Sequence, residues 1–248
     1  MRVLGRGANV LVSDDGFDGV VVRLDHANFR RTQKKGTRLT VGGGVDLTRL
    51  VRYCCVKGLA GLEGMAGIPA TVGGAIRMNA GGRYGEFGDV VARVDVLRPD
   101  GQRESWTRQQ CGFGYRRSKI GNHIVLAAEL ELTEDEPGKV RKRFDEYFAV
   151  KQASQPLAEH SAGCIFKNPS GKSAGALIDQ AGLKGTSCGA ASVSRKHANF
   201  IVATKGATAT DVLRLIDVVR DRVRDVCNTD LEVEIDVWGS SKKAGPHA

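Results

Sequence analysis

The placement of glycine limits most strongly what this chain can fold into. It has 32 glycines, and they gather around residues 42–44, 58–88 and 163–189. Clusters of glycine are tolerated where the backbone turns with positive φ or approaches a ligand closely. Neither a collagen-like period nor a low-complexity repeat accompanies them. We therefore interpret the clusters as binding loops.

The charge balance leaves three interpretations of the surface. The formal net charge is +9, from 37 basic and 28 acidic residues. It can reflect a nucleic-acid binder, a solvated basic surface, or a site for several anions. Aromatic residues are only 6% of the chain, so no stacking platform for bases is expected. We favour the solvated surface, keep the anion site open, and expect no nucleic-acid partner.

Cysteine usage and hydropathy indicate a protein of a reducing compartment. The six cysteines include no C-x-x-C pair, so we expect reduced thiols. No apolar run reaches ~18 residues, so no membrane span is expected. Met1 leads almost directly into an apolar, strand-like segment, which argues against a signal peptide. We expect a cytoplasmic protein without a membrane partner or a bound metal.

Strand and helix patterns are mixed along the chain. Strand-like patterns occupy residues 3–12, 20–24, 37–43, 90–99, 102–107, 123–133, 199–205 and 231–239, with a hairpin at 90–107. Helical patterns occupy residues 46–57, 137–150, 174–181 and 208–227, and 58–88 is predicted to be a glycine-punctuated loop. The regular alternation of a doubly wound sheet is missing, so the predicted fold class is α+β.

Two of the predicted helices have clear end signals. Asp46 can cap the first, and Gly58 can end it. Thr208 or Thr210 can cap the last, which extends to about Cys227. One face of that last helix is predicted to be buried, with apolar residues at helical spacing: Val212, Ile216, Val219, Val223 and Val226.

Two glycine-rich motifs are candidates for phosphate binding. In LGRGANVLV, residues 4–12, a strand enters a glycine turn, and an ordinary strand turn is the default interpretation. Residues 61–86 form a longer, almost uncharged run, and few purely structural loops are this long. From Gly67 to Ala75 its backbone can offer successive N–H donors to a pyrophosphate. Asn79 adds a side-chain donor and acceptor.

Three further motifs have ordinary interpretations when each is taken alone. The string YRRSK can be a solvated basic loop, and we keep that interpretation for Arg117 and Lys119. Cys164 in SAGCIFKNP can be an inert buried thiol. Glu232 and Glu234 alternate with apolar residues in the last predicted strand, so they share one face and can be two solvated acids.

Taken together and in order, these segments resemble the UDP-N-acetylenolpyruvoylglucosamine reductase family over almost all of residues 3–239. The chain contains LGRGANVLV, GLAGLEGMAGIPATVGGAIRMNAG, GYRRSK, SAGCIFKNP, AGLKG, SRKHANFIV and LEVEIDVWG in that order. The central glycine run, FKNP and KHANFIV are the most specific parts. The short region before SAGC resembles the shorter subtype of the family.

The resemblance implies a fold, two cofactors and a reaction. The fold would combine FAD-binding subdomains of the vanillyl-alcohol-oxidase type with an α+β substrate-binding domain. FAD would be bound without a covalent link, and NADPH would supply the hydride. The enolpyruvyl group of a UDP-sugar would be reduced to give UDP-N-acetylmuramate for peptidoglycan synthesis. We expect the protein to act as a monomer on this UDP-sugar.

The same resemblance assigns three catalytic residues. Arg116 and Glu234 would stabilise the negative charge that builds on the substrate carboxylate, with the glutamate protonated or sharing a proton. The family usually places a serine in SAGS to protonate the α-carbon, whereas this chain has Cys164. A thiol is a stronger acid than an alcohol and can serve. We expect activity to fall at high pH, where the thiolate forms.

Binding residues are also carried over by motif. The substrate would be contacted by Tyr115, Lys151, Gln155, Lys167 and Asn168. The cofactor would be contacted by Gly5, Gly7, Ala8, Asn9, Val10, Gly67, Ile68, Pro69, Ala70, Thr71, Val72, Gly73, Gly74, Ala75, Asn79, Ala80 and Gly81.

The resemblance also predicts the domain limits. Residues 1–24 would be the remnant of a first FAD-binding subdomain, 25–155 the second, 156–239 the substrate-binding domain, and 240–248 a disordered tail. Family members normally have some tens of residues before LGxGxN, so we expect an N-terminal truncation that would weaken FAD binding if it is native.

Two rival functions stay open at this point. One is a degenerate module that binds a UDP-sugar without flavin or catalysis. The other is a flavoprotein of the same architecture with another substrate, against which FKNP and KHANFIV argue. Whether the purified protein is yellow separates the first rival from the reductase.

Overall fold

The structure is a computed structural model that describes residues 1–239. The predicted disordered tail, 240–248, lies outside the described residues. The described chain divides into two compact units. The first unit contains Met1–Arg6 and Val21–Ala153, and the second contains Gly7–Val20 and the chain from Ser154 onward. The α+β class is confirmed, and each unit is described by itself below.

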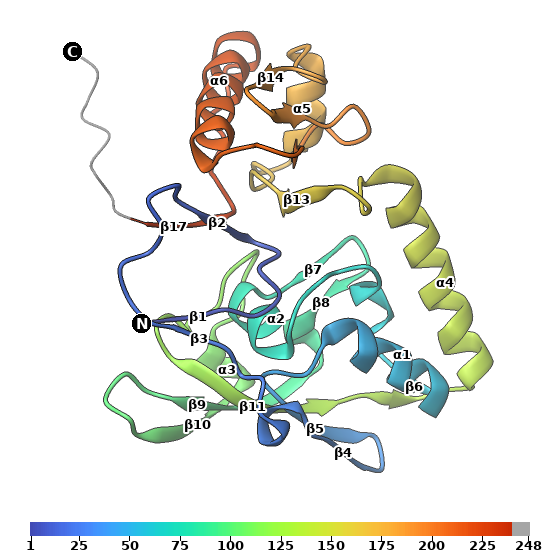
Figure 1. Ribbon diagram of the computed structural model, residues 1–248. Coiled ribbons are helices and arrows are strands. Elements are labelled where there is room, and N and C mark those ends of the chain that lie inside the picture. Colours follow the sequence, from blue (N-terminus) through green and yellow to red (C-terminus); the bar gives the residue numbers. More distant parts are fainter. Residues whose placement is uncertain (240–248) are drawn as a thin grey trace. The chain divides into compact units, whose positions relative to one another are not determined.

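A five-stranded antiparallel sheet forms the base of the first unit (Figure 1). Its order is β10-β9-β11-β5-β4, in which β9 and β10 are the predicted hairpin. The predicted strands at 37–43 and 123–133 are β5 and β11. The strand bounds are β4 Thr32–Lys35, β5 Arg38–Gly42, β9 Val91–Leu97, β10 Arg103–Thr107 and β11 Ile124–Glu131.

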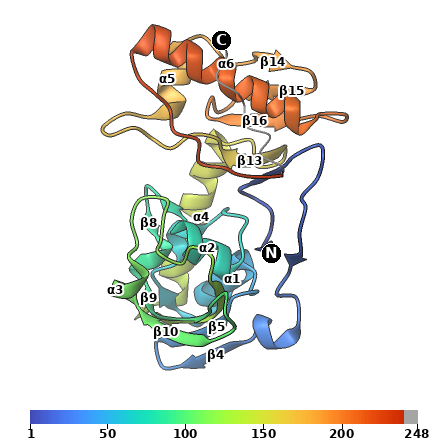
Figure 2. The ribbon, with the colours of Figure 1, turned by 90° about the vertical axis from the view of Figure 1, so that its left-hand side faces the viewer.

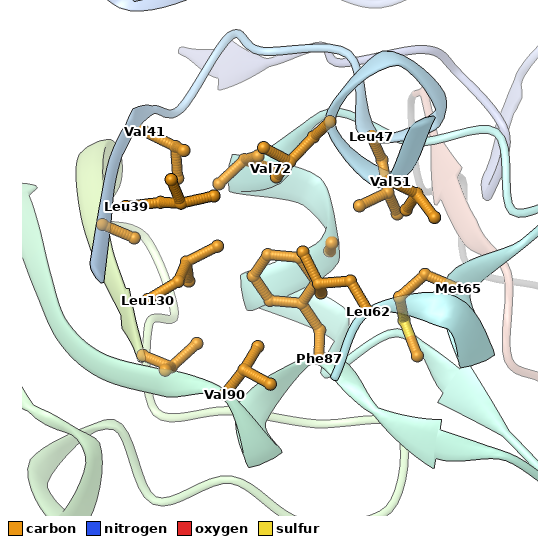
Figure 3. Close-up of a cluster of buried hydrophobic side chains, with 14 of the residues drawn as sticks. Leu39, Val41, Leu47, Val51, Leu62, Met65, Val72, Phe87, Val90 and Leu130 are labelled. Carbon is orange, nitrogen blue, oxygen red and sulfur yellow. The ribbon is translucent and has the colours of Figure 1, made fainter. Parts of the chain in front are cut away.

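Two helices pack on one face of this sheet around a hydrophobic core. Helix α1, Leu47–Lys57, and helix α2, Val72–Met78, lie on that face. In Figure 3 the ring of Phe87 lies at the centre of the cluster and is fully buried. Burying a large apolar side chain stabilises a fold by roughly 1.5–3 kcal/mol, so this cluster holds the unit together.

Helix α1 has the ends that the sequence predicts. The carboxylate of Asp46 accepts a hydrogen bond from the backbone N–H of Arg49 at 3.0 Å. Gly58 ends the helix in the left-handed region with φ 63°. Both helix ends depend on local interactions. The Asp46 cap binds an amide that the first helical turn leaves unpaired, and Gly58 adopts positive φ because it has no Cβ that would clash.

Helix α2 corrects the prediction that residues 58–88 form one loop. Thr71 caps it, accepting from the N–H of Gly74 at 3.3 Å, and Asn79 ends it with φ 44°. Its apolar residues Val72, Ala75 and Ile76 are buried at helical spacing. Burial against the sheet compensates for the low helix propensity of its two glycines.

Helix α4, Pro137–Ser154, confirms the predicted helix at 137–150. A buried carboxylate joins it to the glycine-rich run. Glu63 is 6% exposed and accepts from Arg143 Nε at 2.8 Å and from the N–H of Gly61 at 2.6 Å. Arg143 also donates to Asp135 at 2.8 Å. This network ties α4 to the segment that precedes α2.

Short elements complete the first unit. They are β1 Arg2–Val3, which pairs in parallel with β3 Val21–Val22; β6 Leu59–Ala60, paired with β12 Thr133–Glu134; β7 Gly81–Gly82, paired with β8 Gly85–Glu86; α3 Arg108–Cys111; and the 3-10 turns Ala27–Arg30, Glu63–Met65 and Phe87–Asp89.

The second unit is a four-stranded antiparallel sheet with two helices (Figure 2). The sheet order is β13-β16-β15-β14. The predicted strand at 199–205 and the predicted helix at 174–181 are β16 and α5. The bounds are β13 His160–Cys164, β14 Ser187–Cys188, β15 Ala191–Val193, β16 Phe200–Ala203 and α5 Ala174–Gln180.

Helix α6, Ala209–Cys227, packs its apolar face on this sheet. Thr208 is the cap and accepts from the N–H of Asp211 at 3.0 Å. The predicted buried residues Val212, Ile216, Val219 and Val223 are buried. Val226 was predicted with them but is 43% exposed, because the helix ends one residue later.

The N-terminal segment 7–20 belongs to the second unit. Strand β2, Val10–Val12, pairs in parallel with β17, Asp236–Trp238. The carboxylate of Asp14 accepts from the backbone N–H groups of Ala209 and Thr210 at 2.6 and 2.9 Å. The hydroxyl of Thr210 donates to the same carboxylate at 2.6 Å, and this hydrogen bond, with the two from the backbone, lowers the pKa of Asp14. Together they anchor the segment at the start of α6.

The last strand is shorter than predicted. The sequence predicts a strand over 231–239, but β17 covers only Asp236–Trp238. Before it, Val233 forms a single antiparallel bridge with Phe166. Glu232 and Glu234 flank this bridge and therefore lie outside the regular strand β17.

Two further observations concern residues 1–239. No helix among them is both long and apolar enough to cross a membrane. All six cysteines lie in this range as free thiols.

The Glu63 network leads to a prediction about stability. Replacing Glu63 by alanine leaves Arg143 Nε and the amide of Gly61 without their acceptor, so the free energy of unfolding should fall by about 1–3 kcal/mol. The matched control is Glu131→Ala, because this side chain is 59% exposed. The control should change stability by less than ~0.5 kcal/mol. Urea unfolding measures both, and equal changes would contradict a structural role for Glu63.

Candidate active site

A cavity of about 740 Å³ lies in the first unit. This volume is within the range of roughly 300–1,000 Å³ that small-molecule and cofactor sites occupy. Of the residues predicted to bind the cofactor, Gly5, Thr71, Gly73 and Gly74 line it. Its other walls come from the segments around β3, β5, α1 and the start of β11.

The lining of the cavity is strongly basic. Two acidic residues, Asp25 and Asp46, lie among six arginines. Arg23 pairs with Asp25 at 3.0 Å, and Arg6 lies 3.7 Å from Asp46. The positive charges therefore exceed the negative ones, which suits a diphosphate. The arginines are Arg6, Arg23, Arg30, Arg49, Arg52 and Arg77.

One wall of the cavity is backbone without side chains. A Cβ on Gly43 would lie 2.1 Å from the carbonyl oxygen of Val125, and one on Gly44 would lie 2.0 Å from that of Leu24. Neither position can carry a side chain. This close approach lets Gly43 accept a hydrogen bond from the N–H of Gly73 at 2.8 Å, which places the start of α2 at the cavity.

The sequence predicts that the backbone from Gly67 to Ala75 offers free N–H donors, and this prediction is wrong for most of these residues. The N–H groups of Val72 and Gly73 donate to the carbonyls of Val45 and Gly43, at 2.9 and 2.8 Å. Those of Gly74, Ile68 and Ala75 donate within the chain as well. Helix α2 and its packing use the amides from Val72 to Ala75, and a turn with Met65 uses that of Ile68. The arginine side chains supply the positive field instead.

Asn79 lies inside the protein. Its side chain is 1% exposed and donates to Glu86 Oε2 at 2.6 Å and to the carbonyl of Gly114 at 3.1 Å. Its Oδ1 accepts from the N–H of Gly88 at 2.9 Å. The side chain thus joins the end of α2 to two neighbouring loops.

Arg116 lies on a tight turn of the first unit. The backbones of Gly114 and Arg117 exchange hydrogen bonds at 3.0 and 3.1 Å, so Tyr115 and Arg116 form the tip. Arg116 has φ 53°, a conformation that costs a non-glycine residue roughly 1–3 kcal/mol. Its guanidinium carbon lies 5.1 Å from the ring centroid of Tyr115.

Lys151 is a buried ammonium in the same unit. It extends from α4 and donates to the carbonyls of Gly64 and Ala66 at 3.0 and 2.7 Å. Burial, together with the nearby positive charge of Arg116, lowers its pKa from 10.5 to about 8. At neutral pH the group carries a charge that is poorly solvated, and an anion would stabilise it.

In the second unit, Cys164 and Glu234 are on adjacent backbone segments. Cys164 ends β13, and the next residue, Ile165, accepts from the N–H of Glu234 at 2.7 Å. On the other side, Asn9 donates from Nδ2 to the carbonyl of Glu234 at 3.2 Å, and the N–H of Asp236 donates to the carbonyl of Asn9 at 2.9 Å. Glu234 is therefore held between two segments.

A residue that the sequence interpretation did not select holds the Cys164 segment. Asn199 is 3% exposed, and its side chain both accepts from the N–H of Phe166 at 3.0 Å and donates to its carbonyl at 2.8 Å. The N–H of Ile165 also donates to the carbonyl of Asn199 at 2.9 Å. The available signal was a polar residue between apolar ones in HANFIV.

Two residues that were predicted to contact the substrate form bonds to residues of the second unit. Lys167 pairs with Glu232 at 2.6 Å, although Glu232 is largely exposed. Asn168 Oδ1 accepts from the N–H of Ala174 at 3.0 Å and so supports the start of α5. Gln155 lies at the start of this unit, where its carbonyl accepts from Leu157 at 2.9 Å.

The arginine-lined cavity suits an anionic cofactor, and a model of the FAD binding domain matches residues 1–105. The class of protein is therefore a flavoprotein that binds FAD. A model described as the C-terminal domain of UDP-N-acetylenolpyruvoylglucosamine reductase matches residues 155–238.

Relatives extend this match over the chain. Reductases of that name from Heliobacterium modesticaldum and Bacillus subtilis are 43% and 38% identical; the alignments cover 96% and 97% of this chain and 77% and 80% of theirs. The crystal structure of the reductase from Thermus caldophilus, 41% identical, superimposes with a TM-score of 0.86 over 96% of this chain and 85% of that one. The chain belongs to the UDP-N-acetylenolpyruvoylglucosamine reductase family.

Gly74 offers a test of the cofactor cavity. A Cβ there meets only Thr71 Oγ1 at 3.4 Å, an ordinary contact, and the residue lines the cavity. Gly74→Leu should therefore fold but occupy cofactor space, and its Kd for FAD should rise at least tenfold. Gly138→Leu, in α4 with nothing within 4 Å of its Cβ, is the control. Flavin fluorescence titration measures both, and an unchanged Kd for Gly74→Leu would place FAD elsewhere.

Proposed function

We propose that this chain performs the reaction after which its family is named, with Arg116, Cys164 and Glu234 as its catalytic residues. The substrate is UDP-N-acetylglucosamine enolpyruvate, and the product, UDP-N-acetylmuramate, serves peptidoglycan synthesis. The observation that carries this function is 43% identity to a reductase over 96% of the chain. FAD, when bound in the first unit, would supply the hydride that reduces the enolpyruvyl double bond, with NADPH as the hydride source.

The cavity of the first unit fits the diphosphate of FAD. Its arginines would pair with the phosphate oxygens, and its wall at Gly43 and Gly44 leaves room for a ligand close to the backbone. The alternative of a UDP-sugar-binding module without flavin has no observation in its favour.

Arg116 and Glu234 would act on the substrate carboxylate. When hydride reaches the β-carbon, negative charge spreads onto this carboxylate, and a preorganised cation lowers the energy of that state. Arg116 is held in a strained backbone conformation, which is frequent at functional sites. Glu234 would need its proton there, because an ionised carboxylate repels the developing charge.

Cys164 would complete the reaction by giving the proton of its thiol to the α-carbon. The C–H bond forms as the S–H bond breaks, and solvent then returns a proton to sulfur. Its place at the end of β13, beside the segment that carries Glu234, supports this role.

The UDP-sugar would be contacted by Tyr115, Lys151, Gln155, Lys167 and Asn168. An anion would stabilise the poorly solvated charge of Lys151. Lys167 would release its exposed ion-pair partner, Glu232, and bind a phosphate in its place. Because such nucleotides are polyanions that lipid bilayers exclude, we propose that the protein acts in the cytoplasm. A monomeric state stays a prediction.

Replacement of Cys164 tests the proton donor. Cys164→Ala should lower kcat by about 10²–10⁴-fold, the typical value of a general acid. Cys164→Ser should retain part of the activity, since a hydroxyl can also give a proton. Cys188→Ala, a partly exposed cysteine of the same unit, is the control and should keep wild-type kcat. Steady-state turnover at saturating FAD measures all three, and full turnover of Cys164→Ala would end the assignment.

The pKa of Lys151 leads to a prediction about pH. The group is charged below about pH 8 and neutral above it, so its attraction for phosphate is present at low pH and is lost as pH rises through 8. The KM for the UDP-sugar should therefore rise above pH 8. Bound phosphate would raise the pKa of Lys151 and shift the corresponding change in the complex to higher pH.

The comparison uses two lysines of α4. Lys151→Met should have a higher KM at pH 7 and a flatter KM profile, whereas Lys142→Met, at an exposed position, should follow the wild type. Steady-state kinetics from pH 6.5 to pH 9.5 supply the profiles. A wild-type profile in Lys151→Met would exclude Lys151 as a phosphate contact.

A further inference from the structure

The turn that carries Arg116 combines an exposed residue with one in a strained backbone conformation. Its two tip residues are Tyr115, which is 44% exposed, and Arg116, whose φ is 53°. Its base is closed by the hydrogen bonds between Gly114 and Arg117. Because the conformation of Arg116 is unfavourable for a residue with a side chain, contacts outside the turn must maintain it.

Two such contacts come from the end of α2. Asn79 Nδ2 donates to the carbonyl of Gly114 at 3.1 Å, at the start of the turn. Ser118 Oγ donates to the carbonyl of Arg77 at 2.8 Å, just after the turn. The turn is thus attached to α2 on both sides of Arg116.

The bonding of Asn79 leaves no N–H of its side chain for a ligand. Both N–H donors of its amide are used, by Glu86 and by Gly114, and Oδ1 accepts from Gly88. Its backbone, at φ 44°, ends α2. An asparagine tolerates this left-handed conformation better than most residues.

The chemistry of the site also specifies asparagine. An aspartate would have no N–H to donate, and its carboxylate would face the carboxylate of Glu86 at hydrogen-bond distance. Like charges at that distance repel strongly in a buried site. An alanine would leave the carbonyl of Gly114 and the carboxylate of Glu86 without their donor.

We propose that Asn79 is a positioning residue of the reductase, which holds the 114–117 turn so that Arg116 keeps its strained conformation. The inference rests on the proposed role of Arg116, and it replaces the expected contact between Asn79 and the cofactor. Asn79 acts through Arg116 and touches neither cofactor nor substrate.

The test compares Asn79→Ala, Arg116→Ala and the double variant. Asn79→Ala should lower kcat at least tenfold while its Kd for FAD stays within twofold of the wild type. In the Arg116→Ala background the same change should have no further effect on kcat, because two residues that act as a unit are not additive. Ser118→Ala, a milder loosening of the turn, should lower kcat in the same direction and serves if Asn79→Ala does not fold.

The control is Asn228→Ala, the asparagine that ends α6 with φ 46°. It changes a helix end of the same kind in the other unit and should keep wild-type kcat.

Three results would overturn the proposal. A weakened FAD affinity with normal kcat at saturating FAD would make Asn79 a cofactor contact. An equal loss of kcat in the Arg116→Ala background would show a general structural effect. Unchanged amide hydrogen exchange at Gly114 and Arg117 in Asn79→Ala would show that the turn does not depend on it. Full turnover of Arg116→Ala would instead refute the proposed role of Arg116, while hydrogen exchange would still report whether Asn79 holds the turn.

Discussion

Backbone packed directly against backbone at Gly42–Gly44 is the constraint on which the cofactor cavity depends. A Cβ on any of the three would lie 2.0–2.1 Å from a carbonyl oxygen of a neighbouring segment. With no side chains in between, Gly43 can accept from Gly73, and α2 packs beside the end of β5. Because Gly43 and Gly44 have no side chains, this wall of the cavity is backbone alone, and the space between it and the arginines can hold a ligand.

Asparagines recur beside the proposed catalytic residues, and two of the three are buried. Asn79 binds the turn of Arg116, Asn199 binds Phe166 two residues after Cys164, and Asn9 binds the carbonyl of Glu234. An amide side chain is suited to this because it donates and accepts without a charge that would need a partner. Backbone groups in irregular segments lack the hydrogen bonds that neighbouring strands of a sheet provide, so a side chain that bonds to the backbone supplies some of them.

Local signals predicted the elements whose ends are set by nearby residues. Asp46 with Gly58 marked α1, and Thr208 marked the start of α6, because a cap bonds to an amide within its own first turn. Helix α2 was missed because its glycines suggested a loop, whereas burial of Val72 and its neighbours against the sheet makes it a helix. Val226 and the segment before β17 were misplaced because the exact end of a helix or strand depends on its neighbours in space.

By itself the sequence determined the class of fold, most of the helices, several of the strands, and, through the order of its motifs, the family and its candidate residues. Tertiary structure alone decided how these residues are used. The arginines of the cavity lie far apart in the chain and each looked like an ordinary solvated charge. Lys151 was assigned to the substrate, but its burial in the folded chain and the charge of Arg116 set its pKa near 8. Asn79 was assigned to the cofactor, but its partners lie in loops that only folding brings to it. Charge, burial and hydrogen bonding depend on neighbours in space, and a linear pattern does not contain them.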